Sequence, residues 1–221
     1  MKKTIVIMSG GLDSSTLLYL QRKQFNDEDI LVLFFNYGQK NYLKEKQAVE
    51  MIVPRSIQLK EINIADVFAY SSSGLVNSKI VPYKITTDGN YTNITPNKTV
   101  VEFRNGVFIS TGISIAQQLY SDCEVDIVLG TYGNNPIFYD CTLPFYDHFD
   151  EMAAKQSNNK HHVLSPLSGY TKQEVFDMAV SLGVPVEKTW SCFLGGDAPC
   201  GCCSACVDRL TLRQQIISES V

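Results

Sequence analysis

The sequence predicts an α/β fold: a doubly wound parallel sheet followed by a small, cysteine-rich C-terminal region. Three features of the 221 residues support this prediction. Short apolar runs alternate with helical patterns, a glycine- and serine-rich turn follows the first run, and cysteines gather near the C-terminus. Alternating strands and helices are typical of parallel sheets with helices on both faces. We expect residues 1–185 to form the α/β domain and residues 186–221 the C-terminal region.

Strands are expected where apolar residues run continuously or alternate, at residues 4–8, 30–36, 56–62 and 126–130. Helices are expected at residues 14–23, 41–53, 106–120, 145–155 and 171–182. In the last helix, Thr171 and Glu174 form a capping box, and Gly183 followed by Pro185 ends it. Residues 70–100 are rich in Ser, Thr, Asn and Tyr, which predicts a long loop or lid.

Charge and hydropathy narrow the classes of ligand. The net charge of −4 gives no general attraction to nucleic acid or to an anionic membrane, which favours a small ligand. The apolar run near the N-terminus ends after five residues, and no stretch approaches the roughly 20 apolar residues of a spanning helix. We therefore expect a cytoplasmic protein, in which seven cysteines indicate a metal site rather than disulfides.

The turn "SGGLDSS", residues 9–15, has the chemistry of a phosphate site. Glycines allow close approach to backbone N–H groups, hydroxyls add donors, and the following helix contributes its positive end. The residues expected to bind are Ser9, Gly10, Gly11, Asp13, Ser14 and Ser15. A carboxylate repels phosphate, so Asp13 indicates a bridging Mg²⁺. The alternative is a plain helix N-cap after a glycine turn.

Two common nucleotide motifs are absent from the sequence: GxxxxGK[ST] and GxGxxG. The turn instead resembles the SGGxDS loop of the PP-loop ATP pyrophosphatases. This resemblance implies an adenine nucleotide alpha-hydrolase-like fold and cleavage of ATP to AMP and pyrophosphate, with transfer of AMP to a substrate oxygen. On this interpretation we expect Asp13, Ser14 and Lys172 to serve the reaction itself, with Lys172 facing a phosphate. The alternative for Lys172 is an ordinary solvated lysine.

The C-terminal cysteines have the spacing C-x7-C-x2-C-x2-C, formed by Cys192, Cys200, Cys203 and Cys206. Four thiolates from a short segment can surround Zn²⁺ tetrahedrally, which predicts a structural zinc site. Cys202 competes with Cys203 for this role, and the C-x2-C spacing favours Cys203. An iron–sulfur cluster or redox-active cysteines are the alternatives.

The two motifs together resemble the 7-cyano-7-deazaguanine synthase family. Further stretches carry the resemblance: "NYGQ" at 36–39, "FRNGVFIS" at 103–110, "YDC" at 139–141, "SPLSGYTKQEV" at 165–175 and "TWSCF…PCGCCSAC" at the end. The resemblance implies that 7-carboxy-7-deazaguanine is adenylated by ATP and reacts with ammonia, first to an amide and then to a nitrile. It also implies zinc held by four cysteines and a homodimer.

Further residues are expected at the same site. Tyr37, Gly38 and Gln39 follow a buried strand, and we expect them to contact ATP. The deazaguanine carboxylate is expected to bind Arg104, Asn105, Asp140 and Cys141. A guanidinium suits a carboxylate or phosphate, whereas an amide and a carboxylate suit the edge of a purine-like base. The alternatives are a surface arginine near Glu102 for Arg104 and a turn residue for Cys141.

Histidines are not needed for this chemistry, and the pair at 161–162 is expected in a solvated loop.

The sequence also departs from the family pattern around the substrate. Glu102 and Phe103 replace a proline and a small residue, Asn36 replaces an aspartate, and Thr142 replaces an arginine. These changes leave open that an amine of a protein or another acceptor takes the place of ammonia. A non-catalytic nucleotide-binding protein and a PP-loop enzyme acting on tRNA also stay open, although the acidic charge disfavours tRNA.

Overall fold

The core of the protein is a five-stranded parallel sheet with the strand order β3-β2-β1-β6-β7. The computed structural model describes residues 2–76, 79, 84–85, 91–92, 99–133 and 138–219. The sheet is formed by β1 (Lys2–Met8), β2 (Ile30–Asn36), β3 (Gln58–Asn63), β6 (Glu124–Leu129) and β7 (His161–Leu164). The strand order reverses between β1 and β6, and ligands of such sheets bind at this switch point.

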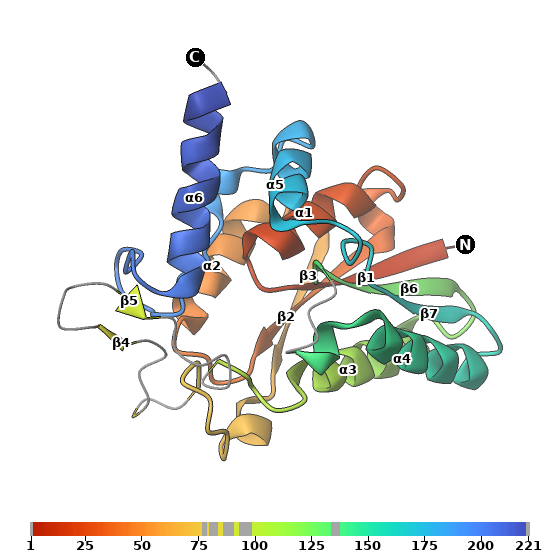
Figure 1. Cartoon of the computed structure of the whole chain (residues 1–221). Helices are drawn as coiled ribbons and strands as arrows, with labels where there is room; N and C mark the ends of the chain where they lie inside the picture. Colours follow the sequence, from red (N-terminus) through yellow and green to blue (C-terminus); the bar gives the residue numbers. More distant parts are fainter. Residues whose placement is uncertain are drawn as a thin grey trace.

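Helices cover both faces of the sheet (Figure 1). One face carries α1 (Leu12–Gln21), α2 (Tyr42–Ile52) and α5 (Lys172–Ser181), and the other carries α3 (Arg104–Leu119) and α4 (Leu143–Gln156). The alternation along β1 divides the core. Val6 packs with Leu17 of α1, whereas Ile5 packs with Ile109 of α3. A strand buried on both faces needs apolar residues at successive positions, as the runs in β1 and β2 provide.

The remaining described elements lie outside this sheet. The strands β4 (Lys84–Ile85) and β5 (Tyr91–Thr92) form a two-stranded antiparallel pair. The helix α6 (Ser204–Glu219) extends from the carboxyl edge of the sheet to the C-terminal end (Figure 1). No helix among the described residues has the length and apolar character needed to cross a lipid bilayer.

The sequence predicted the α/β fold class and the doubly wound parallel sheet, and the structure confirms both. The capping box of α5 is also confirmed, since Thr171 accepts from the Glu174 backbone and Glu174 accepts from the Thr171 backbone. Most of the expected loop at 70–100 lies outside the described residues. The boundary at residue 185 between the α/β domain and the C-terminal region stays a prediction. Leu212 of α6 packs across that boundary, in one cluster with Leu12 and Phe176.

The expectation for the histidine pair was wrong. His161 begins β7 and is only 1% exposed, and its Nε2 lies 3.3 Å from the carbonyl oxygen of Tyr120. His162 pairs with Asp150 through Nδ1 at 3.0 Å. The preceding stretch "KQSNNK" is polar and the strand has only four residues, so the local pattern resembled a loop. β7 forms because it pairs with β6, a contact between distant residues that the local sequence does not reveal.

Candidate active site

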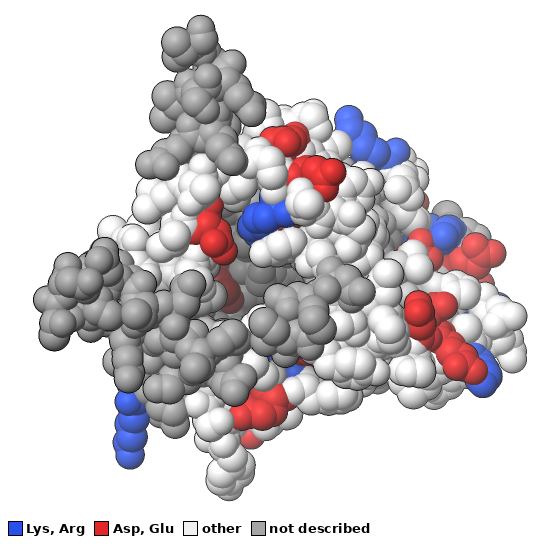
Figure 2. Space-filling view, viewed as in Figure 1, with Lys and Arg blue, Asp and Glu red and all other residues white. Residues whose placement is uncertain are grey.

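A cavity of about 530 Å³ opens where the strands of the sheet end. Its walls come from the ends of β1, β2 and β6, the starts of α3 and α5, and the C-terminal segment. Figure 2 shows a hollow in this face of the molecule, with acidic and basic side chains near its rim. Nine of the predicted site residues line the cavity: Ser9, Gly11, Asp13, Ser14, Tyr37, Arg104, Asn105, Cys141 and Lys172.

Five of the residues predicted to contact ATP or the substrate do not line the cavity. They are Gly10, Ser15, Gly38, Gln39 and Asp140. Ser15 is fully buried, and its hydroxyl donates to the carbonyl of Gly11 at 2.7 Å. Ser14 differs, because its Oγ accepts from the Ser9 backbone at 3.1 Å while the residue remains at the cavity surface. Of these two adjacent serines, Ser14 is thus at the cavity surface and Ser15 is buried within the turn.

Gly10 is essential to the path of this turn. Its φ is +76°, and a Cβ added there would lie 2.7 Å from the carbonyl oxygen of Glu45 and 3.0 Å from Cβ of Ala48. Since both neighbours belong to the packed helix α2, they cannot move freely.

We expect Gly10→Ala to lower the free energy of unfolding by about 2–4 kcal/mol, through strain at positive φ and the close contact with α2. The control is Gly183→Ala, at a similar φ of +71° with no atom of the described residues within 4 Å of the added Cβ. It should cost about 1 kcal/mol. Urea denaturation of both variants measures the difference, and equal losses would show that the contact with α2 is not the cause.

Asp13 and Lys172 meet in the wall of the cavity, although they are 159 residues apart in the chain. Lys172 Nζ donates to Asp13 Oδ1 at 2.5 Å and lies 4.4 Å from the centre of the Tyr132 ring. Burial raises the pKa of Asp13, and the charge and hydrogen bond of Lys172 oppose this rise. Burial likewise raises the pKa of Tyr132 to about 12, so this phenol stays neutral beside the ion pair.

Arg104 lies at the start of α3, near the end of β2. Its Nη1 donates to the Tyr37 hydroxyl at 3.1 Å, and its guanidinium carbon lies 5.4 Å from the centre of that ring. Burial acts to lower the pKa of Arg104, but the interactions with Tyr37 and Asp140 outweigh it, so the net shift is upward. The cavity therefore holds a firmly charged guanidinium, which suits a carboxylate or phosphate.

Asp140 belongs to a short turn beside the start of α3 and holds Asn105 in place. The Asn105 backbone donates to Asp140 Oδ2 at 3.3 Å, and its side-chain Nδ2 donates to the Asp140 carbonyl at 3.0 Å. Cys141 lines the cavity next to this contact, and burial raises its pKa to about 11. A thiol that stays protonated is a poor nucleophile, so Cys141 is suited to shaping the pocket.

Gln39 is 4% exposed and is used within the protein. Its Oε1 accepts from the backbone of Tyr37 at 2.9 Å, and its Nε2 donates to the Phe35 carbonyl and to Glu45 Oε2. A contact between Gln39 and ATP stays a prediction, and the structure places this amide behind the cavity wall. Glu45, which does line the cavity, was not predicted from the sequence.

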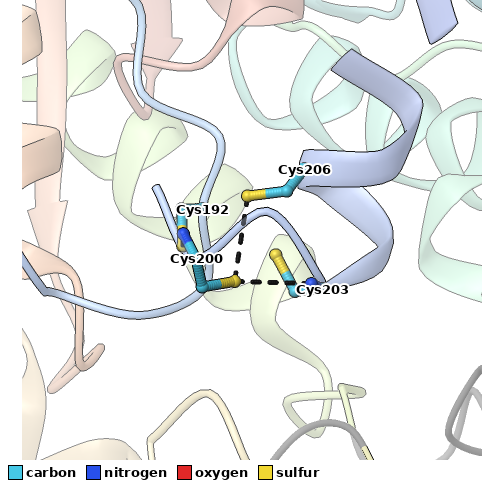
Figure 3. Close-up of side chains that lie close together, drawn as sticks. All are labelled: Cys192, Cys200, Cys203 and Cys206. Atoms are coloured by element: carbon cyan, nitrogen blue, oxygen red, sulfur yellow. Dashed lines mark hydrogen bonds between the residues drawn. The ribbon is translucent and has the colours of Figure 1, made fainter. Parts of the chain in front are cut away.

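The four predicted metal cysteines converge, with all their sulfur atoms within 4.8 Å of one another (Figure 3). The Sγ atoms of Cys200 and Cys206 are 3.9 Å apart. Tetrahedral Zn²⁺ with Zn–S bonds of about 2.3 Å would place its sulfurs about 3.8 Å apart, so the geometry fits zinc. Cys202 is not one of the four, in agreement with the preference for Cys203. Four protein ligands would leave no open position on a bound ion, an arrangement typical of structural zinc sites.

The segment around these cysteines forms one wall of the cavity. The backbone of Trp190 donates to the carbonyl of Gly10 at 2.9 Å, and Asn41 Nδ2 donates to the carbonyl of Cys192 at 2.9 Å. Asp208 and Arg209 of α6 line the cavity together with Trp190. Partial enclosure raises the pKa of Asp208, an effect that Lys172 opposes and Asp13 adds to. None of these wall residues was predicted from the sequence, because their role depends on the docking of a distant segment.

Comparison with known proteins identifies the family of this chain. The family model described as "Queuosine biosynthesis protein QueC" matches residues 3–215. The chain is 34% identical to a 7-cyano-7-deazaguanine synthase from Synechococcus sp. over 214 residues, covering 91% of this chain and 88% of the relative. It is 30% identical to one from Aquifex aeolicus over 215 residues, covering 93% of both chains. Among solved structures, the NH3-dependent NAD synthetase of Campylobacter jejuni aligns with a TM-score of 0.46 and 13% identity over 84% of this chain and 67% of that chain. On the strength of the family match and these relatives, the chain belongs to the QueC family of 7-cyano-7-deazaguanine synthases.

Proposed function

We propose that this protein converts 7-carboxy-7-deazaguanine to 7-cyano-7-deazaguanine with ATP and ammonia. The observation that carries the proposal is the layout of one cavity. The turn of residues 9–15 and the Asp13–Lys172 pair line this cavity and suit the phosphates of ATP. Arg104, in the wall of the same cavity, suits the carboxylate of the substrate. The relatives named for this activity support the assignment.

The chemistry follows from the weakness of a carboxylate as an electrophile. Transfer of AMP to its oxygen, with release of pyrophosphate, creates a leaving group that ammonia can displace to give the amide. A second adenylation, on the amide oxygen, allows elimination to the nitrile. This protein's part is to position the reactants and to stabilise charge.

Ser9, Gly11 and Ser14 bind the pyrophosphate portion of ATP, and Lys172 offsets its negative charge. Asp13 is suited to hold Mg²⁺, because this hard cation prefers carboxylate and phosphate oxygens. Mg²⁺ supplies charge neutralisation at the phosphates when bound. Zinc at the four cysteines supplies stability to the C-terminal wall. A homodimer and a cytoplasmic location stay predictions.

Incubation of the protein with 7-carboxy-7-deazaguanine, ATP and ammonium, followed by mass spectrometry, tests the proposed function. We expect AMP, pyrophosphate and the nitrile. Release of AMP without amide or nitrile would contradict the use of ammonia and favour a different acceptor amine, as the changes around Arg104 allow. If the carboxylate caused no release of AMP at all, the adenylation itself would be refuted.

Arg104→Met is expected to raise the KM for the carboxylate about 100-fold while changing the KM for ATP little, because a charge-assisted contact to the substrate is lost. Arg104→Lys should recover part of this loss, since it restores the charge but not the planar fork. Steady-state kinetics with each substrate varied in turn measure both effects. The control is Arg22→Met, which removes an arginine paired with Asp27 at 2.9 Å outside the cavity. Equal rises in both KM values for Arg104→Met would contradict the assignment.

A further inference from the structure

Glu45 is a carboxylate in the cavity wall to which the proposed function has given no role. It lies in the first turn of α2 and lines the cavity together with Asn41. Both of its oxygens are fixed: Oε2 accepts from Gln39 Nε2 at 3.0 Å, and Oε1 accepts from Asn41 Nδ2 at 3.0 Å. Each carboxylate oxygen can accept a second hydrogen bond, so the group can still receive a ligand.

The two amides that hold Glu45 are themselves anchored. Gln39 is held between the Tyr37 backbone and the Phe35 carbonyl, and Asn41 donates to the carbonyl of Cys192. The Glu45 side chain is therefore tied to β2, α2 and the cysteine segment at once. Such a fixed carboxylate at a cavity surface is typical of a group that binds or moves a proton.

The charges of the wall match the charges of the reactants. The substrate carboxylate is negatively charged and binds best beside a cation, which Arg104 provides. Ammonium is a cation and binds best beside an anion, such as the Glu45 carboxylate. Glu45 and Arg104 line the same cavity and interact electrostatically. Asp13 cannot serve equally, because Lys172 already neutralises it.

We propose that Glu45 binds the ammonium ion and takes a proton from it, so that neutral ammonia is released beside the activated substrate. This inference rests on the proposed function and adds a catalytic base to it. Ammonium has no free electron pair and cannot attack carbon. One N–H bond breaks, its proton goes to the Glu45 carboxylate, and the electron pair remains on nitrogen.

The lone pair of ammonia forms a C–N bond at the acyl carbon of the adenylated substrate. The bond between that carbon and the AMP oxygen breaks, and AMP leaves with the electron pair of the broken bond. The added nitrogen then loses a second proton to the departing phosphate or to water, which leaves the amide. The Glu45 carboxylic acid returns its proton to solvent before the next ammonium ion binds.

The acid–base character of Glu45 suits this role. Burial raises its pKa to about 7, although the hydrogen bonds from Gln39 and Asn41 and the charge of Arg104 act in the opposite direction. Tyr37 is a neighbouring titratable group whose pKa Glu45 acts to raise, and this phenol stays neutral because burial raises its pKa to about 12. A base works best when its pKa lies near the operating pH.

The test uses Glu45→Gln in the full-length protein. Isotope exchange between pyrophosphate and ATP, measured with the carboxylate substrate but without ammonium, should stay within about threefold of the parent protein, because adenylation does not need this base. The kcat/KM for ammonium at pH 7 should fall about 100-fold, the usual effect of losing a general base. Glu61→Gln is the matched control, since Glu61 also accepts two side-chain hydrogen bonds, from Tyr42 and Lys46, but lies outside the cavity.

Two further readouts separate a base from a structural support. Hydroxylamine is mostly uncharged at pH 7 and needs no deprotonation before attack, so Glu45→Gln should form the hydroxamate nearly as fast as the parent protein. The deficit with ammonium should also shrink as the pH rises, because more free ammonia is then present. Glu45→Asp keeps the negative charge but places it on a shorter side chain, so it should show a weaker form of the same selective loss with ammonium. This variant serves as the test if Glu45→Gln folds poorly.

The outcomes are distinguishable. An equal loss with ammonium and hydroxylamine, or a loss of pyrophosphate exchange, would overturn the role of Glu45. Unchanged use of ammonium by Glu45→Gln would overturn it as well. If the parent protein itself formed neither amide nor hydroxamate while exchanging pyrophosphate, the proposed use of ammonia would fail instead.

Discussion

Cys203→Ser is expected to reduce bound zinc from about one ion per chain to nearly none and to destabilise the protein strongly. Metal-binding energy in structural zinc sites is folding energy, because the site is not formed in the unfolded chain. Loss of a ligand should cost about 3–5 kcal/mol, which in a chain of this size lowers Tm by about 10 °C. Metal analysis and thermal unfolding measure the two effects.

The matched control is the neighbouring cysteine. Cys202→Ser removes a buried thiol that is not one of the four converging cysteines, so the variant should keep its zinc. Zinc loss in both variants, or in neither, would contradict the assignment of Cys203.

Zinc removal should also affect the active site, because Cys192 is joined to Asn41 and the segment that follows Trp190 forms a cavity wall. In Cys203→Ser protein that remains folded at low temperature, pyrophosphate exchange should be impaired. Normal pyrophosphate exchange in protein shown to lack metal would mean that this cavity wall keeps its structure without zinc.

Asp13→Asn is expected to lower the rate of AMP formation about 1,000-fold with little loss of stability. The substitution keeps the shape of the side chain but removes the charge that pairs with Lys172 and is suited to hold Mg²⁺. Release of AMP in the presence of the carboxylate measures the rate, and circular dichroism shows whether the fold is kept.

Asp29→Asn controls for the loss of a salt bridge. Asp29 pairs with Lys3 at 2.8 Å outside the cavity, so its replacement should leave the rate within about twofold of the parent protein. Lys172→Met combined with Asp13→Asn should cost less than the sum of the two single changes, because the two residues act as a unit. Undiminished AMP formation by Asp13→Asn would refute its role.

Much of the fold was predictable because its signals are local. The apolar runs of β1 and β2 and the capping box of α5 are determined by residues adjacent in the chain. β7 was missed because four residues carry too weak a pattern, and α6 was missed because it begins within the cysteine cluster. Both elements gain order from contacts with distant residues.

The candidate site divides in the same way. The turn of residues 9–15 and the cysteine spacing are short motifs whose chemistry can be recognised in sequence, and the structure brings the four cysteines together as the spacing predicted. Gln39 belongs to a motif too, but only the structure shows that its amide is used to hold Tyr37 and Glu45. A motif identifies a residue as part of a site without revealing which way its side chain faces.

The α/β class, the glycine- and serine-rich turn of residues 9–15 and the grouping of four cysteines could all be predicted from the sequence, because their signals lie in residues close together in the chain. The tertiary structure alone decided that Lys172 reaches Asp13, that Trp190 and Asp208 form a wall of the cavity, and that Glu45 lies in it beside Asn41. The physical reason is that charge pairing and burial depend on distance in space. Residues far apart in the sequence acquire these properties only when the sheet and the C-terminal segment pack together.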